Sequence, residues 1–178
     1  SLERNTQYWL RVYYKLENDN TVYYSATNPN DYVRFDTAIW EGKGTDIEPY
    51  LISSVDELKD IKFLLSGKFK QSVDLDLAGV AWIPLGETSQ DPFTGVYDGN
   101  QKKIQNLSVV RTNSEIGLGM FGYAQSAAIR GITLENLSVT ESNTGSKIAG
   151  LIGFDSASTV SGCDIVHAVI TGYGSVSG

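Results

Sequence analysis

The spacing of apolar residues changes along this chain. In its middle the period is two, because Val73, Leu75 and Leu77 alternate with polar residues that include Asp74 and Asp76. Successive side chains of a β-strand point to opposite faces, so this pattern predicts a strand with one apolar face and one carboxylate face. Similar short runs, separated by Gly, Asn and Asp, recur towards the end of the chain. We therefore predict an all-β architecture for most of the molecule.

One segment before that strand has helical spacing instead. Apolar residues recur at three- and four-residue intervals from Val55 to Leu65, which places them on one face of a helix. Ser54 and Glu57 fit a capping box at its start. We predict a helix near residues 54–66. Because a helix of about 12 residues is only marginally stable alone, it must dock its apolar face on a core.

Two stretches of glycine and apolar residues indicate an internal repeat. Met120 in the first stretch corresponds to Leu151 in the second, and the same offset relates Ile129 to Val160. Units that repeat both glycines and apolar positions are typical of stacked supersecondary units. The arrangement of short β runs in such units predicts a parallel β-helix, in which each coil buries its apolar residues against the next.

The repeat leaves its register open in one place. One alignment makes Ile104 equivalent to Ile129, whereas a longer offset matches Asn106-Leu107-Ser108-Val109 with Asn136-Leu137-Ser138-Val139. Both alignments place the same residues inside. We expect Gly122 and Gly153 at equivalent corners, and the 54–66 helix over one open end of the solenoid, since uncovered β edges promote association.

The first forty residues follow a different pattern. Strands are predicted at residues 8–14 and 21–25, around the turn-forming Asn18-Asp19-Asn20, and at residues 32–35. The segment is rich in tyrosine, which suits either a sandwich core or a stacking surface. Breaker residues and charges between 41 and 50 mark a boundary. The expected organisation is an antiparallel β segment at 1–43, followed by the β-helix at 44–178.

Composition and charge argue against several classes of partner and of structure. The 178 residues include 14 basic and 21 acidic residues, a net charge of −7 that argues against nucleic acid as a partner. The single cysteine, Cys163, makes no intramolecular disulfide. No apolar run approaches the length of roughly 20 residues that spans a membrane. The chain stops at what looks like the end of a repeat, so we expect further repeats after Gly178.

Several ordered motifs resemble those of the GLUG-motif proteins of bacterial surfaces, over about residues 44–178. They are Pro49-Tyr50-Leu51-Ile52, Val55-Asp56-Glu57-Leu58, Val73-Asp74-Leu75-Asp76-Leu77, Trp82-Ile83-Pro84-Leu85-Gly86, Pro92-Phe93-Thr94-Gly95-Val96-Tyr97-Asp98-Gly99-Asn100 and the Gly-Leu-Ile-Gly type repeat. The resemblance implies a right-handed parallel β-helix in secreted or surface-anchored proteins, many of them classed as adhesins and frequently from Bacteroidetes. The same repeat accompanies IgA-specific metallopeptidases.

Residues 1–40 lie outside these motifs and resemble the closing strands of fimbrillin-like or other β-sandwich domains. Two features depart from the GLUG pattern. The first glycine stretch is an imperfect copy, and Cys163 and Ala168 stand where bulkier apolar residues are usual. We therefore expect loose packing in the last coil.

Three aspartates are the candidates for catalytic chemistry. Asp74 and Asp76 share one face of a strand and could form a glycosidase pair or a calcium site, while Asp98 lies in a turn motif. The competing interpretation is that they are a solvated strand face or satisfy backbone donors at turns. A lyase would also need a cationic base, and the nearby cations are Lys102, Lys103 and Arg130.

Other candidate residues favour structural roles. His167, the only histidine, has no second ligand at metal spacing, and we expect it to be an outward strand residue. Cys163 is interpreted as a small core hydrophobe rather than a nucleophile. The His-Glu-x-x-His motif of zinc peptidases is absent from the sequence.

These observations favour a non-enzymatic protein of the bacterial cell surface, either secreted or at the outer membrane. It would be an adhesin or fimbria-associated binding module that contacts a surface protein or a glycan of the host or of bacteria. No catalytic, cofactor-binding or metal-ligating residue is assigned, and no cofactor or integral membrane segment is expected. The alternatives are a carbohydrate-active β-helix enzyme using Asp74, Asp76 or Asp98, and an accessory repeat region of a surface peptidase.

Overall fold

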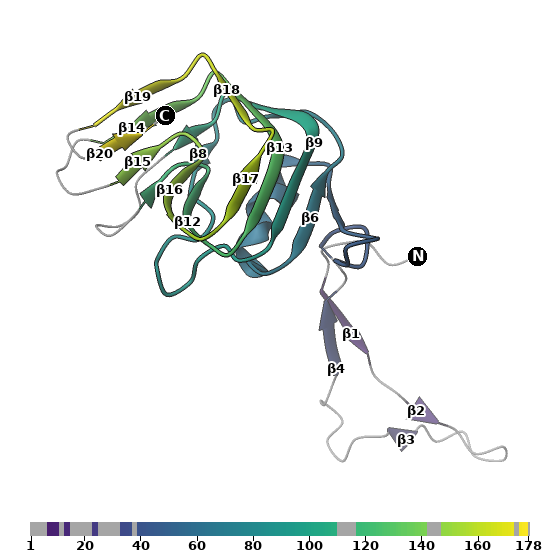
Figure 1. Ribbon diagram of the computed structural model, residues 1–178. Helices are drawn as coiled ribbons and strands as arrows, with labels where there is room; N and C mark the ends of the chain where they lie inside the picture. Colours follow the sequence, from purple (N-terminus) through teal and green to yellow (C-terminus); the bar gives the residue numbers. More distant parts are fainter. Residues whose placement is uncertain are drawn as a thin grey trace. The chain divides into compact units, whose positions relative to one another are not determined.

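The computed structural model describes residues 39–109, 117–141 and 147–172, together with the backbone of five further strands at 7–10, 13–14, 23–24, 33–36 and 175–177. The chain divides into two compact units, Ser1–Ile39 and Trp40–Gly178. The described parts of both units consist mainly of β-strands (Figure 1).

The first unit contains two antiparallel strand pairs. β1 (Gln7–Leu10) pairs with β4 (Val33–Asp36), and β2 (Tyr13–Tyr14) pairs with β3 (Tyr23–Tyr24). The antiparallel segment expected at the start of the chain is thereby confirmed. The tyrosine side chains lie outside the described residues, and the origin of this segment in a β-sandwich stays a prediction.

The second unit is a parallel β-solenoid with one short helix (Figure 1). Its first strands are β5 (Tyr50–Ile52), β6 (Lys68–Gln71), β7 (Leu75–Asp76), β8 (Ala81–Trp82), β9 (Val96–Gln105) and β10 (Ser108–Val109). They are followed by β11 (Gly117–Leu118), β12 (Phe121–Gln125), β13 (Ala128–Glu135), β14 (Ser138–Thr140) and β15 (Lys147–Ala149). The last turn holds β16 (Ile152–Ser156), β17 (Thr159–Ser161), β18 (Asp164–Val166), β19 (Val169–Thr171) and β20 (Ser175–Ser177).

Equivalent strands of successive turns pair in parallel, which confirms the predicted β-helix. β6, β9, β13 and β17 stack in that order, and β8, β10, β14 and β19 form a second stack (Figure 1). Phe69, Tyr97 and Ile129 occupy one column of the first stack and are fully buried. The core is therefore a set of side-chain columns that run from turn to turn.

The register resolves the ambiguity in the repeat. Ile104 pairs with Leu134, which agrees with the longer of the two offsets, while Ile129 pairs with Tyr97. The alignment of Ile104 with Ile129 is therefore wrong. It fails because β9 and β13 each continue around a corner, where Gly131 adopts a φ of +63° and the register shifts. Each long strand thus contributes inward residues to two walls of the solenoid.

The expected strand around Val73 is also interrupted by a corner. β6 ends at Gln71 and β7 begins at Leu75, so Val73 lies between them and is exposed. Leu75 and Leu77 are buried as predicted. A period of two holds only within each straight wall, because a corner resets the side-chain alternation.

The last turn is more exposed than the turns before it, while its loose packing stays a prediction. Val160 is 46% exposed, although Ile129 in the same column is fully buried. Cys163 is half-buried and Ala168 is exposed. Within the described residues, this turn is stacked on its neighbour by one side only, which leaves its inward side chains partly in contact with solvent.

The helix forms where expected but is shorter. α1 covers Val55–Asp60 and tightens into a 3-10 turn, η1, at Ile61–Phe63. The Ser54 hydroxyl accepts a hydrogen bond from the Glu57 N–H at 3.2 Å, as an N-cap does. The Glu57 carboxylate accepts from the Ser53 N–H at 2.7 Å, so the reciprocal bond of the capping box goes to the preceding residue.

The helix covers the first turn of the solenoid. Leu58 and Ile61 are fully buried, and Trp40 packs on Phe69 with ring centroids 5.1 Å apart. The Trp40 indole N–H donates to the Glu57 carbonyl at 2.9 Å. The segment around Trp40 therefore fixes the helix against the solenoid.

The repeated glycines lie inside strands, so their expected position at corners is wrong. Gly122 of β12 is in register with Gly153 of β16. A Cβ on Gly153 would lie 2.3 to 2.5 Å from backbone atoms of Gly117 and Leu118. The glycines are needed because two backbone segments meet here with no room for a side chain.

Candidate functional site

Asp74 and Asp76, the candidate paired carboxylates, are engaged in contacts between turns. One oxygen of Asp74 accepts the Lys103 N–H at 2.9 Å. One oxygen of Asp76 accepts from the Asn106 amide at 2.7 Å and from the Ala78 N–H at 2.9 Å. These bonds, of which the first is the larger effect, hold the pKa of Asp76 below its ordinary value. Asp76 is therefore ionised at neutral pH and is poorly suited to donate a proton.

Asp98 has a similar structural role. One carboxylate oxygen accepts two hydrogen bonds from the Arg130 guanidinium, at 3.0 and 3.1 Å. The other oxygen accepts the Asn100 N–H at 2.8 Å and so stabilises the local turn. The structure thus keeps the three aspartates in bonds within the scaffold, which agrees with the structural interpretation of these residues.

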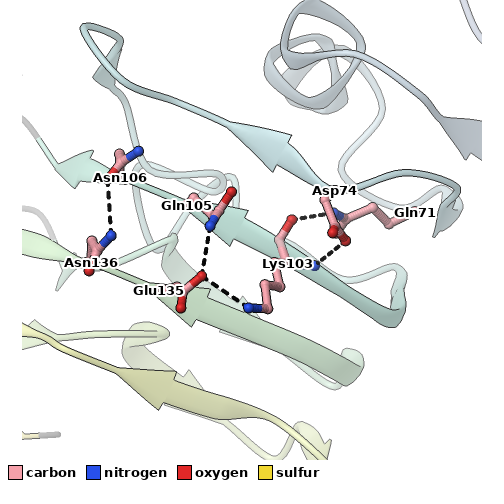
Figure 2. A network of polar contacts seen from close by, with 7 residues as sticks. All are labelled: Gln71, Asp74, Lys103, Gln105, Asn106, Glu135 and Asn136. Atoms are coloured by element: carbon pink, nitrogen blue, oxygen red, sulfur yellow. Dashed lines mark hydrogen bonds and ion pairs between the residues drawn. The ribbon is translucent and has the colours of Figure 1, made fainter.

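A polar network runs across the outer face of β9 and β13 (Figure 2). Glu135 accepts hydrogen bonds from the Gln105 amide at 2.7 Å and from the Lys103 ammonium at 3.2 Å. Bonds to these two side chains lower the pKa of Glu135. The contacts join residues about one turn apart, so the network stabilises the stacking of turns.

An asparagine column marks one corner of the solenoid. Asn106 and Asn136 both adopt a φ of 57°, and the Asn136 amide donates to the Asn106 side-chain oxygen at 3.3 Å (Figure 2). His167 follows at the equivalent position of the next turn, with a φ of 56°. His167 is exposed, as expected, but it lies at a corner after β18 rather than in a strand. Asn and His are among the residues that most readily adopt this left-handed conformation.

The other candidate residues are scattered. Cys163 is half-buried rather than part of the buried core, and its thiol donates to the Ser161 carbonyl at 3.4 Å. Among the described residues, the Lys102 ammonium has no hydrogen-bond or ion-pair partner. In that part of the chain, no group of three or more His, Cys, Asp and Glu side chains is placed to hold a metal ion.

Gln71 is the main polar residue that the sequence pattern does not reveal. It is fully buried, and its amide oxygen accepts the Tyr97 hydroxyl at 3.0 Å. Its amide nitrogen donates to the carbonyls of Val73 and Lys103, at 2.8 and 2.9 Å. Burial, with a smaller contribution from the neighbouring Asp98 charge, raises the pKa of Tyr97. The Tyr97 hydroxyl therefore remains protonated at neutral pH, and the hydrogen-bonded pair supports the first corner from inside.

An apolar cleft of about 340 Å³ lies between η1 and the segment after β8. Leu65, Pro84 and Leu85 contribute to its lining. Phe63 is 67% exposed and Ile83 is 47% exposed, so two large apolar side chains border the cleft in contact with water. Exposed apolar residues grouped at a concave surface are typical of a binding site.

Charged residues border this cleft on two sides. Lys59 and Lys62 come from the helical segment, and Glu87 and Asp91 come from the loop after β8. The Lys62 ammonium lies 4.9 Å from the centroid of the Phe63 ring, a cation–π distance. The cleft thus combines an apolar lining with cations along one border and carboxylates along the other.

Comparison with known proteins supports the fold and leaves the family open. No known protein-family model matches the sequence. The chain is 34% identical over 131 residues to halomucin from Haloquadratum walsbyi, which corresponds to 67% of this chain and 1% of halomucin. The chain therefore matches only a small part of that relative.

A solved structure has a similar fold. The crystal structure of a provisionally assigned immunoglobulin A1 protease from Bacteroides ovatus aligns with a TM-score of 0.55 and 18% sequence identity. The alignment covers 74% of this chain and 51% of the other. At this identity the similarity shows the fold alone. In the described residues, no helix has the length and apolar character needed to cross a membrane.

Proposed function

We propose that this chain is a non-enzymatic binding module of a secreted or cell-surface protein, of the GLUG-motif type, and that it contacts a glycan or a surface protein through the apolar cleft. The β-solenoid provides a rigid support, and the cleft beside η1 provides the contact surface. Its exposed aromatic ring and aliphatic side chains suit the apolar face of a sugar ring or an apolar side chain of a protein.

The observation that carries this proposal is the grouping of exposed Phe63 and Ile83 at the cleft. Leaving large apolar side chains in water is unfavourable, and covering them releases roughly 25 cal/mol for each Å² buried. The candidate aspartates give no competing support, because Asp74, Asp76 and Asp98 all hold the scaffold together. The halomucin match and the Bacteroides ovatus fold are consistent with an extracellular setting.

A glycan array and a panel of surface proteins test the proposal with the full chain. We expect binding that Phe63→Ser weakens about tenfold, the effect of losing about 1.4 kcal/mol. Val73→Thr is the matched control, because Val73 is also an exposed apolar residue but does not line the cleft. Equal effects of the two substitutions would contradict the assignment of the cleft.

The carbohydrate-active alternative is tested by a polysaccharide-degradation assay on the same protein. Turnover that Asp76→Asn abolishes, with the fold intact by circular dichroism, would favour an enzyme and refute the non-enzymatic proposal. Binding without turnover supports the binding module. A role as the accessory region of a peptidase predicts instead that the contacted ligand is a protein.

A further inference from the structure

A second hollow, which we call the polar recess, lies on the outer side of β6, β9 and β13. Its volume is about 280 Å³. The strands contribute Lys68, Lys70, Asp98 and Arg130, and the loop at residues 45–49 forms the opposite side. Figure 1 shows these three strands side by side. The recess is separate from the apolar cleft, since no residue lines both.

Two of the three cations in the polar recess are already paired. The Lys68 ammonium lies 2.6 Å from a carboxylate oxygen of Asp46. The Arg130 guanidinium binds one oxygen of Asp98 through two nitrogens, at 3.0 and 3.1 Å. A guanidinium has five N–H donors, so Arg130 keeps donors beyond those that Asp98 uses. These pairs make the recess polar without adding net charge.

Lys70 is the unpaired cation. It is half-buried and lies in register with Asp98, which is followed in the next turn by Arg130. Within the described residues, its ammonium has no hydrogen-bond or ion-pair partner. Lys70 also borders the neighbouring hollow, which Glu41 and Glu48 line as well, and Glu48 is paired with Lys43 at 2.7 Å. Among the described residues, Lys70 is thus the cation of the recess that no carboxylate contacts directly.

The rim of the recess adds an apolar surface. Ile47 is 98% exposed, and Pro49 lies beside it in the loop. A ligand that receives hydrogen bonds from Lys70 can therefore also place C–H groups on this rim. Nucleic acid is disfavoured, because its binding needs many cations along an extended path, whereas the recess offers one unpaired ammonium, which suits a single anionic group.

We propose that the polar recess binds one anionic group of an acidic polysaccharide, either the carboxylate of a uronic acid or a sulfate ester. The Lys70 ammonium donates to the anionic oxygens, and the remaining donors of Arg130 widen the contact. The sugar ring lies against Ile47 and Pro49. The site is independent of the apolar cleft, so a module that binds nothing at the cleft can still bind here.

The test uses the full chain in about 0.1 M salt, where exposed charges more than roughly 10 Å apart are largely screened. The probes are an oligogalacturonide, dextran sulfate and neutral dextran, with isothermal titration calorimetry as the measurement. We expect binding of one or both charged polymers and none of dextran. The two charged probes distinguish a carboxylate site from a sulfate site.

Matched lysine substitutions locate the site. Lys70→Gln should weaken binding about tenfold, because a hydrogen bond to a charged group contributes about 1.5 kcal/mol or more. Lys102→Gln changes the net charge equally at another unpaired lysine and should have little effect. Lys70→Arg, which keeps the charge, should retain most of the affinity.

Three outcomes would overturn the proposal. The first is the absence of binding to either charged polymer, and the second is an equal loss from Lys70→Gln and Lys102→Gln, which would indicate non-specific attraction. The third is a poly-glutamate peptide that binds as tightly as the polysaccharides with the same dependence on Lys70, since the recess would then recognise acidic protein. Melting temperatures close to wild type establish that the variants are folded.

Discussion

Gln71 offers the sharpest test of how the solenoid is stabilised. We consider Gln71→Leu, a change that keeps the side chain about the same size and removes its amide. The side chain is fully buried and makes three hydrogen bonds, to the Tyr97 hydroxyl and to the carbonyls of Val73 and Lys103. The substitution leaves all three partners without Gln71 as a donor or acceptor.

The magnitude follows from the burial of those partners. A buried polar group that loses its hydrogen bond costs about 1 to 3 kcal/mol. The Tyr97 bond is buried, whereas the two carbonyl bonds are partly buried, so water can replace some of what the carbonyls lose. We expect Gln71→Leu to lower the free energy of unfolding by about 3 to 5 kcal/mol.

A double-mutant cycle with Gln71→Leu and Tyr97→Phe, measured by urea unfolding, gives the contribution of the hydrogen bond between Gln71 and Tyr97. Tyr97→Phe removes the hydroxyl, so the double variant no longer buries an orphan donor there. The loss in the double variant should be smaller than the sum of the single losses by about 1 to 2 kcal/mol. Gln125→Leu is the control, because Gln125 is exposed, and it should change stability by about 0.5 kcal/mol or less. Additive losses, or near-wild-type stability of Gln71→Leu, would refute the reasoning.

Other substitutions test the core, the glycine contact, the acid response and the helix. Leu134→Ala should cost about 2 to 5 kcal/mol in urea unfolding, because Leu134 is fully buried, and a wild-type midpoint would contradict its inward position. Gly153→Ala should lower the melting temperature more than Gly79→Ala, since an added Cβ meets backbone at Gly153, whereas at Gly79 it meets open space and only the strain of a φ of +76° remains. Because folding lowers the pKa of Asp76, the ionised carboxylate stabilises the fold above the ordinary aspartate pKa, and this stabilisation is lost as the pH falls through the pKa of the folded state. Asp76→Asn should therefore flatten the fall in melting temperature below about pH 4. An unchanged acid profile would contradict this role of Asp76. Deleting α1 and η1 should promote association measured by light scattering, whereas a strictly monomeric product would refute the covering role of the helix.

The stacking of turns is predictable because it depends on short-range patterns that recur. Glycine and apolar positions make Met120 equivalent to Leu151, and the structure places Phe121 opposite Ile152 at the same offset. The N-cap at Ser54 is equally local, since the donor it satisfies belongs to Glu57 in the first turn of the helix. Each of these features is decided by a few neighbouring residues.

The corners are the main obstacle to prediction. A corner interrupts the alternation, so the pattern places Val73 inside and aligns Ile104 with Ile129, where the structure has Tyr97. The burial of Gln71 is not predictable from the local pattern, because the hydrogen bonds that satisfy its buried amide come from Tyr97 and Lys103, which lie 26 and 32 residues away in the sequence. The corner position of His167 is recognisable in principle, because it follows the spacing of Asn106 and Asn136.

The candidate sites depend on side-chain geometry that spacing alone does not give. The aspartates are evident as candidates in the sequence, but only their partners in adjacent turns show that they hold the scaffold. The cleft at Phe63 depends on the segment after β8, and the unpaired state of Lys70 depends on the pairing of the charged residues around it. Neither property is visible in one strand or helix considered alone.

The asparagine column at the corner has a consequence for which substitutions this sequence can accept during evolution. Asn106, Asn136 and His167 share a backbone conformation that few residues adopt without cost, whereas outward strand positions between the corners have no such restriction. If every position were substituted in turn, the fraction of tolerated substitutions should therefore rise and fall along the chain with a period of one turn. It should be lowest at the corners and at the inward positions of the columns. New ligand preferences can then arise at outward positions while the architecture is inherited unchanged.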